Sequence, residues 1–180
     1  DNALSGLRDL GYIIESPKVL DAAFFDVPQH RKRWIVLGTR GDIPISYPKP
    51  SDKPMECESV FKRPLDNVSN HITRMHKADT VIRYMKLAVG QRDHLGRVDR
   101  LDPTKPSKTV IAGGVKGGGR SHLHPFIPRT LSVRESARLQ TFPDSYIFTG
   151  TTARQFTQVG NAVPPMLAYK LALQIKIAIV

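Results

Sequence analysis

The chain has 180 residues, with 27 Lys and Arg against 16 Asp and Glu, a net charge of +11 and a sequence pI near 10.0. A hydrophobic share of 40% at this length is enough for a core, which argues against a disordered tail or a disulfide-stapled miniprotein. Because Cys57 is the one cysteine, the chain can form neither an internal disulfide nor a cysteine-based zinc site. A single cysteine fits a reducing, intracellular setting best.

The first forty residues have the pattern of the end of an α/β sheet. Apolar residues at helical spacing predict a helix over residues 2–10, which Gly11 ends. Residues 12–14 and 18–20 resemble strands, and residues 33–38 form a compact apolar run of the buried-strand type. The N-terminus has no signal-peptide pattern and begins in mid-helix, which suggests a chain cut from something longer.

The middle of the chain is predicted to be mostly irregular. Prolines punctuate residues 41–70 without periodicity, which indicates a connection and a domain boundary. We expect a helix over residues 79–89, and a strand over 105–112 that runs into a glycine-rich loop. Five glycines within residues 113–119 let a backbone approach a ligand closely, but they do not match a phosphate-binding P-loop, so a nucleotide site is not expected.

Two helices are predicted in the last third. Ser132 and Glu135 have the spacing of a capping box, so a helix should begin at Val133. Pro165 can start the final helix, which is apolar on most sides over residues 166–180 and should be buried against something large. Apolar runs are far shorter than the roughly 20 residues needed to cross a bilayer, so no membrane span is expected.

The positive charge concentrates in residues 71–120, which hold eleven basic and four acidic side chains. Such a stretch, with His71, His76 and His94 among its cations, is typical of a face that binds a polyanion such as nucleic acid. A solvated surface that only keeps the protein soluble is the alternative.

Three segments together resemble one family. Gln29, Arg31 and Arg33 form a Gln-x-Arg-x-Arg pattern before an apolar strand, and residues 129–144 and 158–165 are similar to the family's ninth and tenth motifs. In this order, and separated by a variable basic segment, they resemble the C-terminal part of a bacterial DNA cytosine-5 methyltransferase. The resemblance covers essentially the whole chain.

The resemblance implies an α/β fold class, namely the C-terminal portion of a Rossmann-like methyltransferase sheet plus a small, mostly irregular target-recognition domain. The expected division has four parts: 1–40, the end of the catalytic α/β domain; 41–128, the target-recognition domain; 129–154, the motif that organises it; and 155–180, a C-terminal helix returning to the catalytic domain.

In this family a cysteine thiolate attacks carbon 6 of a flipped-out cytosine, and S-adenosylmethionine methylates carbon 5. The cofactor loop, the Pro-Cys nucleophile and the Glu-Asn-Val motif all normally precede the first matching segment, and the sequence holds none of them. Cys57 lacks the preceding proline and lies between two glutamates, whose charge raises a thiol pKa, so it is not expected to be the nucleophile. We therefore expect the chain alone to be inactive, to need an N-terminal half or subunit, and to expose apolar surface that promotes self-association.

The resemblance assigns catalytic roles to Arg33, as a cation beside the cytosine O2, and to Arg31 as its support. It assigns an edge of the S-adenosylmethionine site to Asn161 and Val163, with the main cofactor loop outside this chain. Solvated charge at a sheet edge and an ordinary Gly-Asn turn are the simpler alternatives. Around the helix that follows Ser132, Arg134, Glu135 and Arg138 are expected to form an ion-pair scaffold, with a carboxylate or phosphate compensating the two arginines.

Double-stranded DNA is the expected partner, read mainly from residues 71–120. No metal is expected, because His122 and His124 have no third ligand nearby and local hydrogen bonding explains them better. The candidate DNA-binding residues are Gln29, Arg92, Arg97, Arg100, Lys108, Thr109, Gly113, Gly114 and Arg120.

Two functions remain open at this point. The first is the recognition half of a DNA cytosine-5 methyltransferase used in restriction-modification, in the bacterial cytoplasm and associated with the nucleoid. The alternative is a non-catalytic, sequence-specific DNA-binding module derived from the same family. Retention of Arg31, Arg33 and Asn161 favours the enzyme, because a pure DNA binder has no need of residues that serve cytosine and cofactor.

Overall fold

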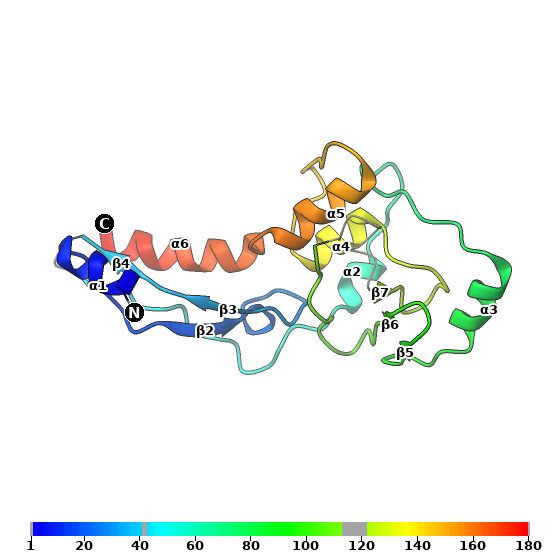
Figure 1. The fold of residues 1–180 in the computed structure, drawn as a ribbon, viewed down its shortest axis with the longest axis horizontal. Coiled ribbons are helices and arrows are strands. Elements are labelled where there is room, and N and C mark those ends of the chain that lie inside the picture. Colours follow the sequence, from blue (N-terminus) through cyan, green and yellow to red (C-terminus); the bar gives the residue numbers. More distant parts are fainter. Residues whose placement is uncertain (1, 41–42, 113–121, 180) are drawn as a thin grey trace.

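The computed structural model describes residues 2–40, 43–112 and 122–179. The molecule is elongated, with a β-ribbon and a long helix at one end and a helix-rich lobe at the other (Figure 1). The ribbon end is built from the first forty residues and from the last helix, α6 (Pro165–Ile179). The two chain termini therefore lie at the same end, and the middle of the sequence forms the opposite lobe.

The ribbon consists of two antiparallel ladders in succession. β1 (Ile13–Ile14) pairs with β4 (Gly38–Thr39), and β2 (Lys18–Asp21) pairs with β3 (Lys32–Ile35). A bond from the Glu15 N–H to the Leu37 carbonyl, 2.9 Å long, continues the pairing between the two ladders. Within the described residues, each of these two sheets has two strands.

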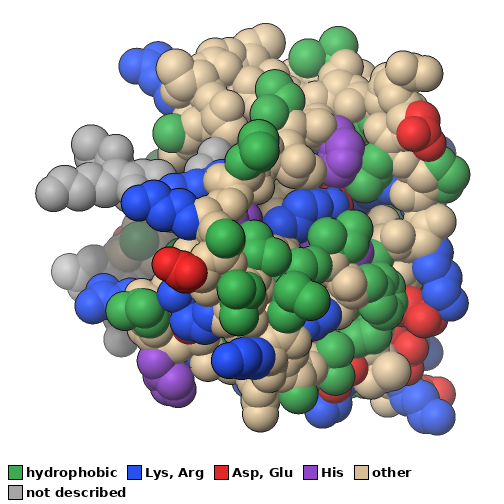
Figure 2. All heavy atoms as spheres, turned by 90° about the vertical axis from the view of Figure 1, so that its right-hand side faces the viewer, with side chains coloured by type: hydrophobic (Ala, Val, Ile, Leu, Met, Phe, Trp, Pro, Cys, Tyr) green, Lys and Arg blue, Asp and Glu red, His purple; other side chains and the backbone are tan. Residues whose placement is uncertain are grey.

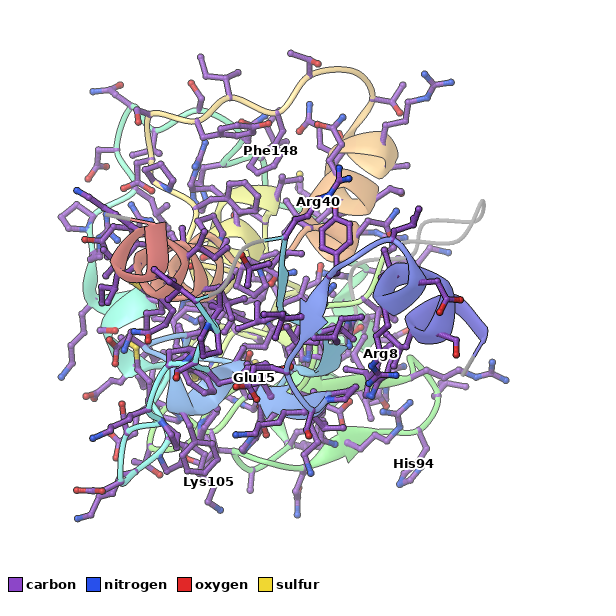
Figure 3. The ribbon with its side chains drawn as sticks, turned by 90° about the vertical axis from the view of Figure 1, so that its left-hand side faces the viewer. Arg8, Glu15, Arg40, His94, Lys105 and Phe148 are labelled. Carbon is purple, nitrogen blue, oxygen red and sulfur yellow. The ribbon has the colours of Figure 1, made fainter. Side chains whose placement is uncertain are left out.

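Helices flank the ribbon. α1 (Asn2–Asp9) is followed by Gly11, whose φ of 85° gives the left-handed turn that favours glycine. The C-terminal helix α6 runs along the ribbon. Viewed from the ribbon end, α6 and α1 lie on opposite sides of the strands (Figure 3). A short 3₁₀ turn, η1 (Ala22–Phe24), follows β2. The core of this end joins the ribbon to α6 through Leu20, Ala22, Phe25, Val27 and Leu167.

The opposite lobe has a larger core and short elements. β5 (Arg92–Asp93), β6 (Val98–Arg100) and β7 (His122–Leu123) form a sheet in the order β5-β6-β7, with an antiparallel and then a parallel pairing. Its helices are α2 (Glu58–Lys62), α3 (Ala78–Met85), α4 (Val133–Leu139) and α5 (Thr152–Asn161). The core residues are Cys57, Val60, Leu101, Val110, Leu131, Val133, Ala137, Leu139, Phe148, Phe156 and Val159.

Several predicted elements are confirmed. The N-terminal helix, the strands β1 and β2 and the starts of α4 and α6 lie where the sequence places them. The run 33–38, expected as one buried strand, is instead divided between β3 and β4, and its Trp34 is 60% exposed. The capping box is present, because the Ser132 hydroxyl accepts from the Glu135 N–H while the Glu135 carboxylate accepts from the Ser132 N–H.

Other predictions were wrong. The strand expected over 105–112 is an irregular extended segment with a single bridge, between Gln29 and Ser107, because it follows the 27–31 loop instead of joining a sheet. The helix expected over 79–89 ends at Met85. The expected C-terminal helix is two helices separated at residues 162–164, and α6 is largely uncovered because the ribbon meets only one of its sides.

Candidate functional site

The 27–31 loop lies against the segment 105–112, and this contact builds the site. The His30 N–H donates to the Ser107 carbonyl (2.8 Å), and the Ser107 N–H donates to the Pro28 carbonyl (3.0 Å). The Thr109 hydroxyl donates to the His30 carbonyl at 2.6 Å. Backbone bonding therefore fixes the register of the two segments before any long side chain is considered.

The Gln29 side chain bonds both to the segment 105–112 and to the C-terminal end of α4. Its side-chain oxygen accepts from the Val110 N–H at 2.6 Å, and its amide nitrogen donates to the Gln140 side-chain oxygen at 3.0 Å and to the Leu139 carbonyl at 3.5 Å. The side chain is fully buried. Because its polar atoms are bonded within the chain, the geometry favours a positioning role over the expected direct contact with DNA.

The Arg31 side chain bonds to the segment 105–112 and to the end of α5. Its side chain is buried, and its two terminal nitrogens donate to the carbonyls of Val110 (3.1 Å) and Gly160 (2.7 Å), while Nε has no partner within the described residues. Burial lowers the pKa of this guanidinium to about 10, and the charge of nearby Arg33 adds to the lowering. We call the cluster of Gln29, Arg31, Val110, Gln140 and Gly160 the polar junction.

Gly160 permits the closest contact of the junction. A Cβ at this position would lie 2.2 Å from the Ala112 nitrogen and 2.4 Å from the Ile111 carbonyl carbon, so only glycine lets the end of α5 approach that backbone. The Gln140 amide donates to the Val159 carbonyl at 2.8 Å, which holds α5 from α4. Sequence reasoning missed these roles of Gly160 and Gln140; a glycine inside a helical stretch was the available signal.

Arg33 lies on β3, two residues beyond Arg31, and it is exposed where Arg31 is buried. One of its terminal nitrogens donates to the carbonyl of its neighbour Lys32 at 2.7 Å. Most donors of the guanidinium thus have no partner among the described residues. The two arginines that the sequence groups together have different surroundings, one within the junction and one on the surface of the ribbon.

The corner between α5 and α6 carries the residues expected to touch the cofactor. Asn161, the last residue of α5, and Val163 in the link are both exposed. Gly160, the neighbour of Asn161, is held by Arg31, so the junction fixes the backbone of this corner.

Behind the junction, α4 is a buried ionic scaffold, as the sequence predicts. Arg138 donates to both carboxylate oxygens of Asp144 at 2.9 Å, and Arg134 lies 4.0 Å from the same carboxylate. Hydrogen bonds from Arg138 hold the pKa of Asp144 below its usual value. Asp144 is the carboxylate expected to compensate the two arginines one helical turn apart.

The third member of the scaffold, Glu135, pairs with Arg129 through two bonds of 2.7 and 2.8 Å. Burial alone would raise the pKa of this carboxyl, but the bonds from Arg129 and from the Ser132 N–H hold it below its usual value.

The other candidate DNA-binding residues differ in their surroundings. Arg92 and Lys108 each pair with Asp99 at 2.7 Å, so their charges are partly neutralised. Arg100 donates to the carbonyls of Tyr84, Leu87 and Pro125 and fixes the end of α3, whereas Arg97 is exposed. The predicted contacts at Gly113, Gly114 and Arg120 lie outside the described residues.

The structure assigns local roles to the remaining titratable candidates. His124 accepts from the Phe126 and Ile127 N–H groups through Nδ1, and burial lowers the pKa values of His122 and His124 to about 4. No group of three metal-ligating side chains occurs within the described residues. Burial raises the pKa of the Cys57 thiol to about 12, and the charges of nearby carboxylates raise this pKa by a smaller amount. Desolvation is therefore the main reason that the thiolate is disfavoured.

With this geometry in view, comparison with known proteins is decisive. The sequence profile of the C-5 cytosine-specific DNA methylase family matches residues 1–177. The chain belongs to this family. The type II methyltransferase M.Eco47II of Escherichia coli is 30% identical over 194 residues, and M.NgoFVII of Neisseria gonorrhoeae is 29% identical over 201.

The match covers unequal shares of the two partners. It includes 91% of this chain but 46% of M.Eco47II, and 96% of this chain but 52% of M.NgoFVII, so the chain spans about half the length of these relatives. A type II methyltransferase of a Picosynechococcus species, M.AquIB, is 41% identical over 123 residues, which cover 59% of this chain and 86% of that relative. M.AquIB is therefore itself a short chain.

Solved structures share the fold of this DNA methylase chain. A protein encoded within an E. coli prophage, whose structure is described as that of a DNA modification methyltransferase, superposes with a TM-score of 0.84 at 21% identity, over 98% of this chain and 64% of its own. The Dnmt2 methyltransferase of S. pombe gives 0.61 at 14% identity. The fold is thus α/β and corresponds to part of a Rossmann-like methyltransferase. No helix among the described residues is long and apolar enough to span a membrane.

Proposed function

We propose that this chain is the recognition half of a DNA cytosine-5 methyltransferase, which methylates a specific duplex sequence within a bacterial restriction-modification system. The observation that carries the proposal is the polar junction. Arg31 and Gln29 tie the Arg33 strand, the basic segment through Val110, and the Asn161 corner into one unit. Three segments that a methyltransferase needs near one base are thereby held in fixed relation.

Arg33 is the residue proposed to act on the cytosine. Its exposed guanidinium can place a fixed positive charge beside O2 of a flipped-out pyrimidine, where electron density increases when a thiolate adds to the ring. The junction supplies the rigidity for this task, because Arg31 fixes the backbone just before the strand.

The Asn161 corner fits one edge of S-adenosylmethionine, which supplies the methyl group when bound. The exposed amide of Asn161 offers both a donor and an acceptor, and Val163 offers exposed apolar surface for the rest of such a ligand. A complete cofactor site needs a further loop, and we assign that loop to the N-terminal half.

The same half is proposed to supply the nucleophile. Cys57 is buried in the core of the helix-rich lobe, donates from Sγ to the Asp102 carbonyl and has a raised pKa. A thiol in that state is a poor nucleophile. A relative as short as M.AquIB supports the idea that such a half can exist as its own chain.

The test is methyl transfer from labelled S-adenosylmethionine to DNA by this chain, by a matching N-terminal half, and by the two mixed. We expect activity only in the mixture. Activity of this chain alone would overturn the assignment of the nucleophile to the other half, and silence of the mixture would favour the non-catalytic DNA-binding module.

Within the active mixture, Arg33→Ala should lower the rate of methyl transfer about 10²- to 10³-fold while leaving duplex binding nearly unchanged. Lys32→Ala is the matched control, since Lys32 is the adjacent exposed cation on β3. Equal rates for the two variants would remove Arg33 from the reaction.

A further inference from the structure

The basic stretch 71–112 holds far fewer free charges than its composition indicates. Of its nine Lys and Arg side chains, four are paired with carboxylates: Arg83 with Asp93, Arg92 and Lys108 with Asp99, and Lys105 with Asp102. A fifth, Arg100, is bonded to three backbone carbonyls. The cations left exposed without a hydrogen bond or ion pair to the described residues are Arg74, Lys77, Lys86 and Arg97.

Two of these free cations border one pocket of about 510 Å³. Arg74, Met75 and Lys77 line it together with Thr80 and Tyr84 of α3 and with Gly96 of the turn between β5 and β6. Arg97 follows Gly96 in the turn between β5 and β6, and its φ of 54° gives it a backbone conformation uncommon for a long side chain. Two of the four unneutralised cations of this stretch therefore line one concavity, and a third, Arg97, follows a residue that lines it.

Apolar side chains lie next to these cations. Met75 is 95% exposed and Ile72 is 73% exposed, in a segment with neither helix nor strand. Leu95, in the turn across the pocket, is also exposed. The face that carries α3 shows basic side chains interleaved with apolar ones (Figure 2). Such a mixture suits a groove of nucleic acid, which offers phosphates at its edges and sugars and base edges at its floor.

The exposed segment 72–75 is held at both ends. His71 shares a 2.9 Å hydrogen bond with the Ser132 hydroxyl at the start of α4, and His76 contacts the Thr130 hydroxyl at 3.2 Å while its Nε2 accepts from the Thr130 N–H. The Arg134 N–H donates to the Asn70 carbonyl just before the segment. Four exposed residues between fixed ends lose little further backbone entropy on binding, so they are pre-organised for a partner.

We propose that duplex DNA docks on this face, with phosphates at Arg74 and Lys77 and a groove against Ile72 and Met75. This inference rests on the proposed function and adds a specificity-determining segment, Ile72–Met75, that the sequence did not single out. Arg92 and Lys108, which the sequence favoured, contribute less because Asp99 already neutralises them in part.

The phosphate contacts are tested by the salt dependence of duplex binding by the chain mixed with its N-terminal half. R74A/K77A should reduce the slope of log affinity against log salt by about 1.8, since each phosphate contact contributes about 0.9. K49A/K53A is the matched control, because it removes the same charge from exposed lysines at the ribbon end.

The outcomes separate this inference from the proposed function. A mixture that binds no DNA overturns both. A mixture that binds and methylates DNA, while the two double variants show equal slopes, overturns the docking face and leaves the proposed function intact.

The groove contact is tested by Met75→Ala in the same mixture, with selection of bound duplexes from a randomised pool. We expect an unchanged salt slope and relaxed preference at one or two base pairs, each by roughly 5- to 100-fold. Ile147→Ala, at an exposed apolar position of the same lobe that does not line the pocket, is the comparison variant. An unchanged selected sequence for Met75→Ala overturns the assignment of specificity to the segment.

Discussion

The central helix of one end and the β-ribbon of the other differ in how far their side chains are buried and paired within the chain. In the helix-rich lobe even the polar residues of α4 are buried with partners, and Asp144 and Glu135 compensate the arginines around them. At the ribbon end, Val19 and Trp34 face each other across β2 and β3 and remain 64% and 60% exposed. The charged side chains of α4 find their partners within their own lobe, whereas the ribbon end has an apolar face and strand edges of the kind that a partner covers.

The largest predicted effect is in the helix-rich lobe. Gly160→Ala places a Cβ against the backbone of Ile111 and Ala112, where no flexible side chain can yield. We expect a loss of about 3 kcal/mol or more in the free energy of unfolding, measured by urea denaturation. Gly6→Ala, in α1 with open space around the new Cβ, should be neutral or slightly stabilising. A Gly160→Ala protein as stable as wild type would show that the junction is not closely packed.

Asp144→Asn should have the next largest effect. It removes the charge that Arg138 and Arg134 share, and Arg63 also donates to this carboxylate. Because Asp144 is partly exposed, the expected cost is about 2 kcal/mol, less than for a fully buried pair. Glu58→Gln, which breaks the exposed Glu58–Lys62 pair, should change stability by at most about 0.5 kcal/mol. Equal effects would contradict the description of α4 as a buried ionic scaffold.

Acid should weaken the helix-rich lobe. Burial lowers the pKa values of His122 and His124 to about 4, so between pH 6.5 and 4 the unfolded chain binds protons that the folded chain does not. Stability then falls with pH by about 1.4 kcal/mol per pH unit for each histidine. His124→Asn keeps an acceptor for the Phe126 N–H, and it should reduce the dependence of stability on pH by close to the contribution of one histidine.

This pH profile is measured by denaturant titrations at pH 7, 6 and 5. Near His124, Glu135 favours the protonated ring, whereas Arg129 and Arg100 oppose it. An identical slope in wild type and His124→Asn would mean that the ring is protonated in the folded lobe.

The smallest effect on stability is predicted at the ribbon. V19S/W34S replaces two exposed apolar side chains, so the free energy of unfolding should change by less than about 0.5 kcal/mol. Self-association of the chain, measured by sedimentation, should decrease, and rescue of methyl transfer by the N-terminal half should weaken. Ile147→Ser, at an exposed apolar position of the other lobe that does not line the pocket, should change neither. Unchanged sedimentation and rescue in V19S/W34S would mean that this face meets no partner.

Features that depend on neighbouring residues could be predicted from the sequence, whereas features that depend on distant residues could not. Local signals placed α1, α4 and the ribbon, because capping residues and apolar periodicity act within a few neighbours along the chain. The ionic scaffold of α4 was foreseeable too, since two arginines one turn apart need a counter-charge. The opposite surroundings of Arg31 and Arg33 were not, because the Val110 and Gly160 carbonyls that capture Arg31 are 79 and 129 positions away.

The same limit applies to the basic segment. Counting its cations indicated a charged face, but the count could not show that Asp99 neutralises both Arg92 and Lys108. Which charges remain free depends on the pairing of β5 with β6 and on the turn that follows Arg92. The strand expected over 105–112 failed for a related reason, because its backbone partners are a loop, at Pro28 and His30.

The two histidine anchors of the segment 72–75 have a consequence for how specificity can change over time. His71 and His76 hold the backbone through Ser132 and Thr130, so the four side chains between them contribute little to the core. Substitutions there can accumulate at low cost in stability, which makes the segment an exchangeable cassette. A library randomised at these four positions and selected for methylation of new sequences should yield folded variants at high frequency, with altered targets among them.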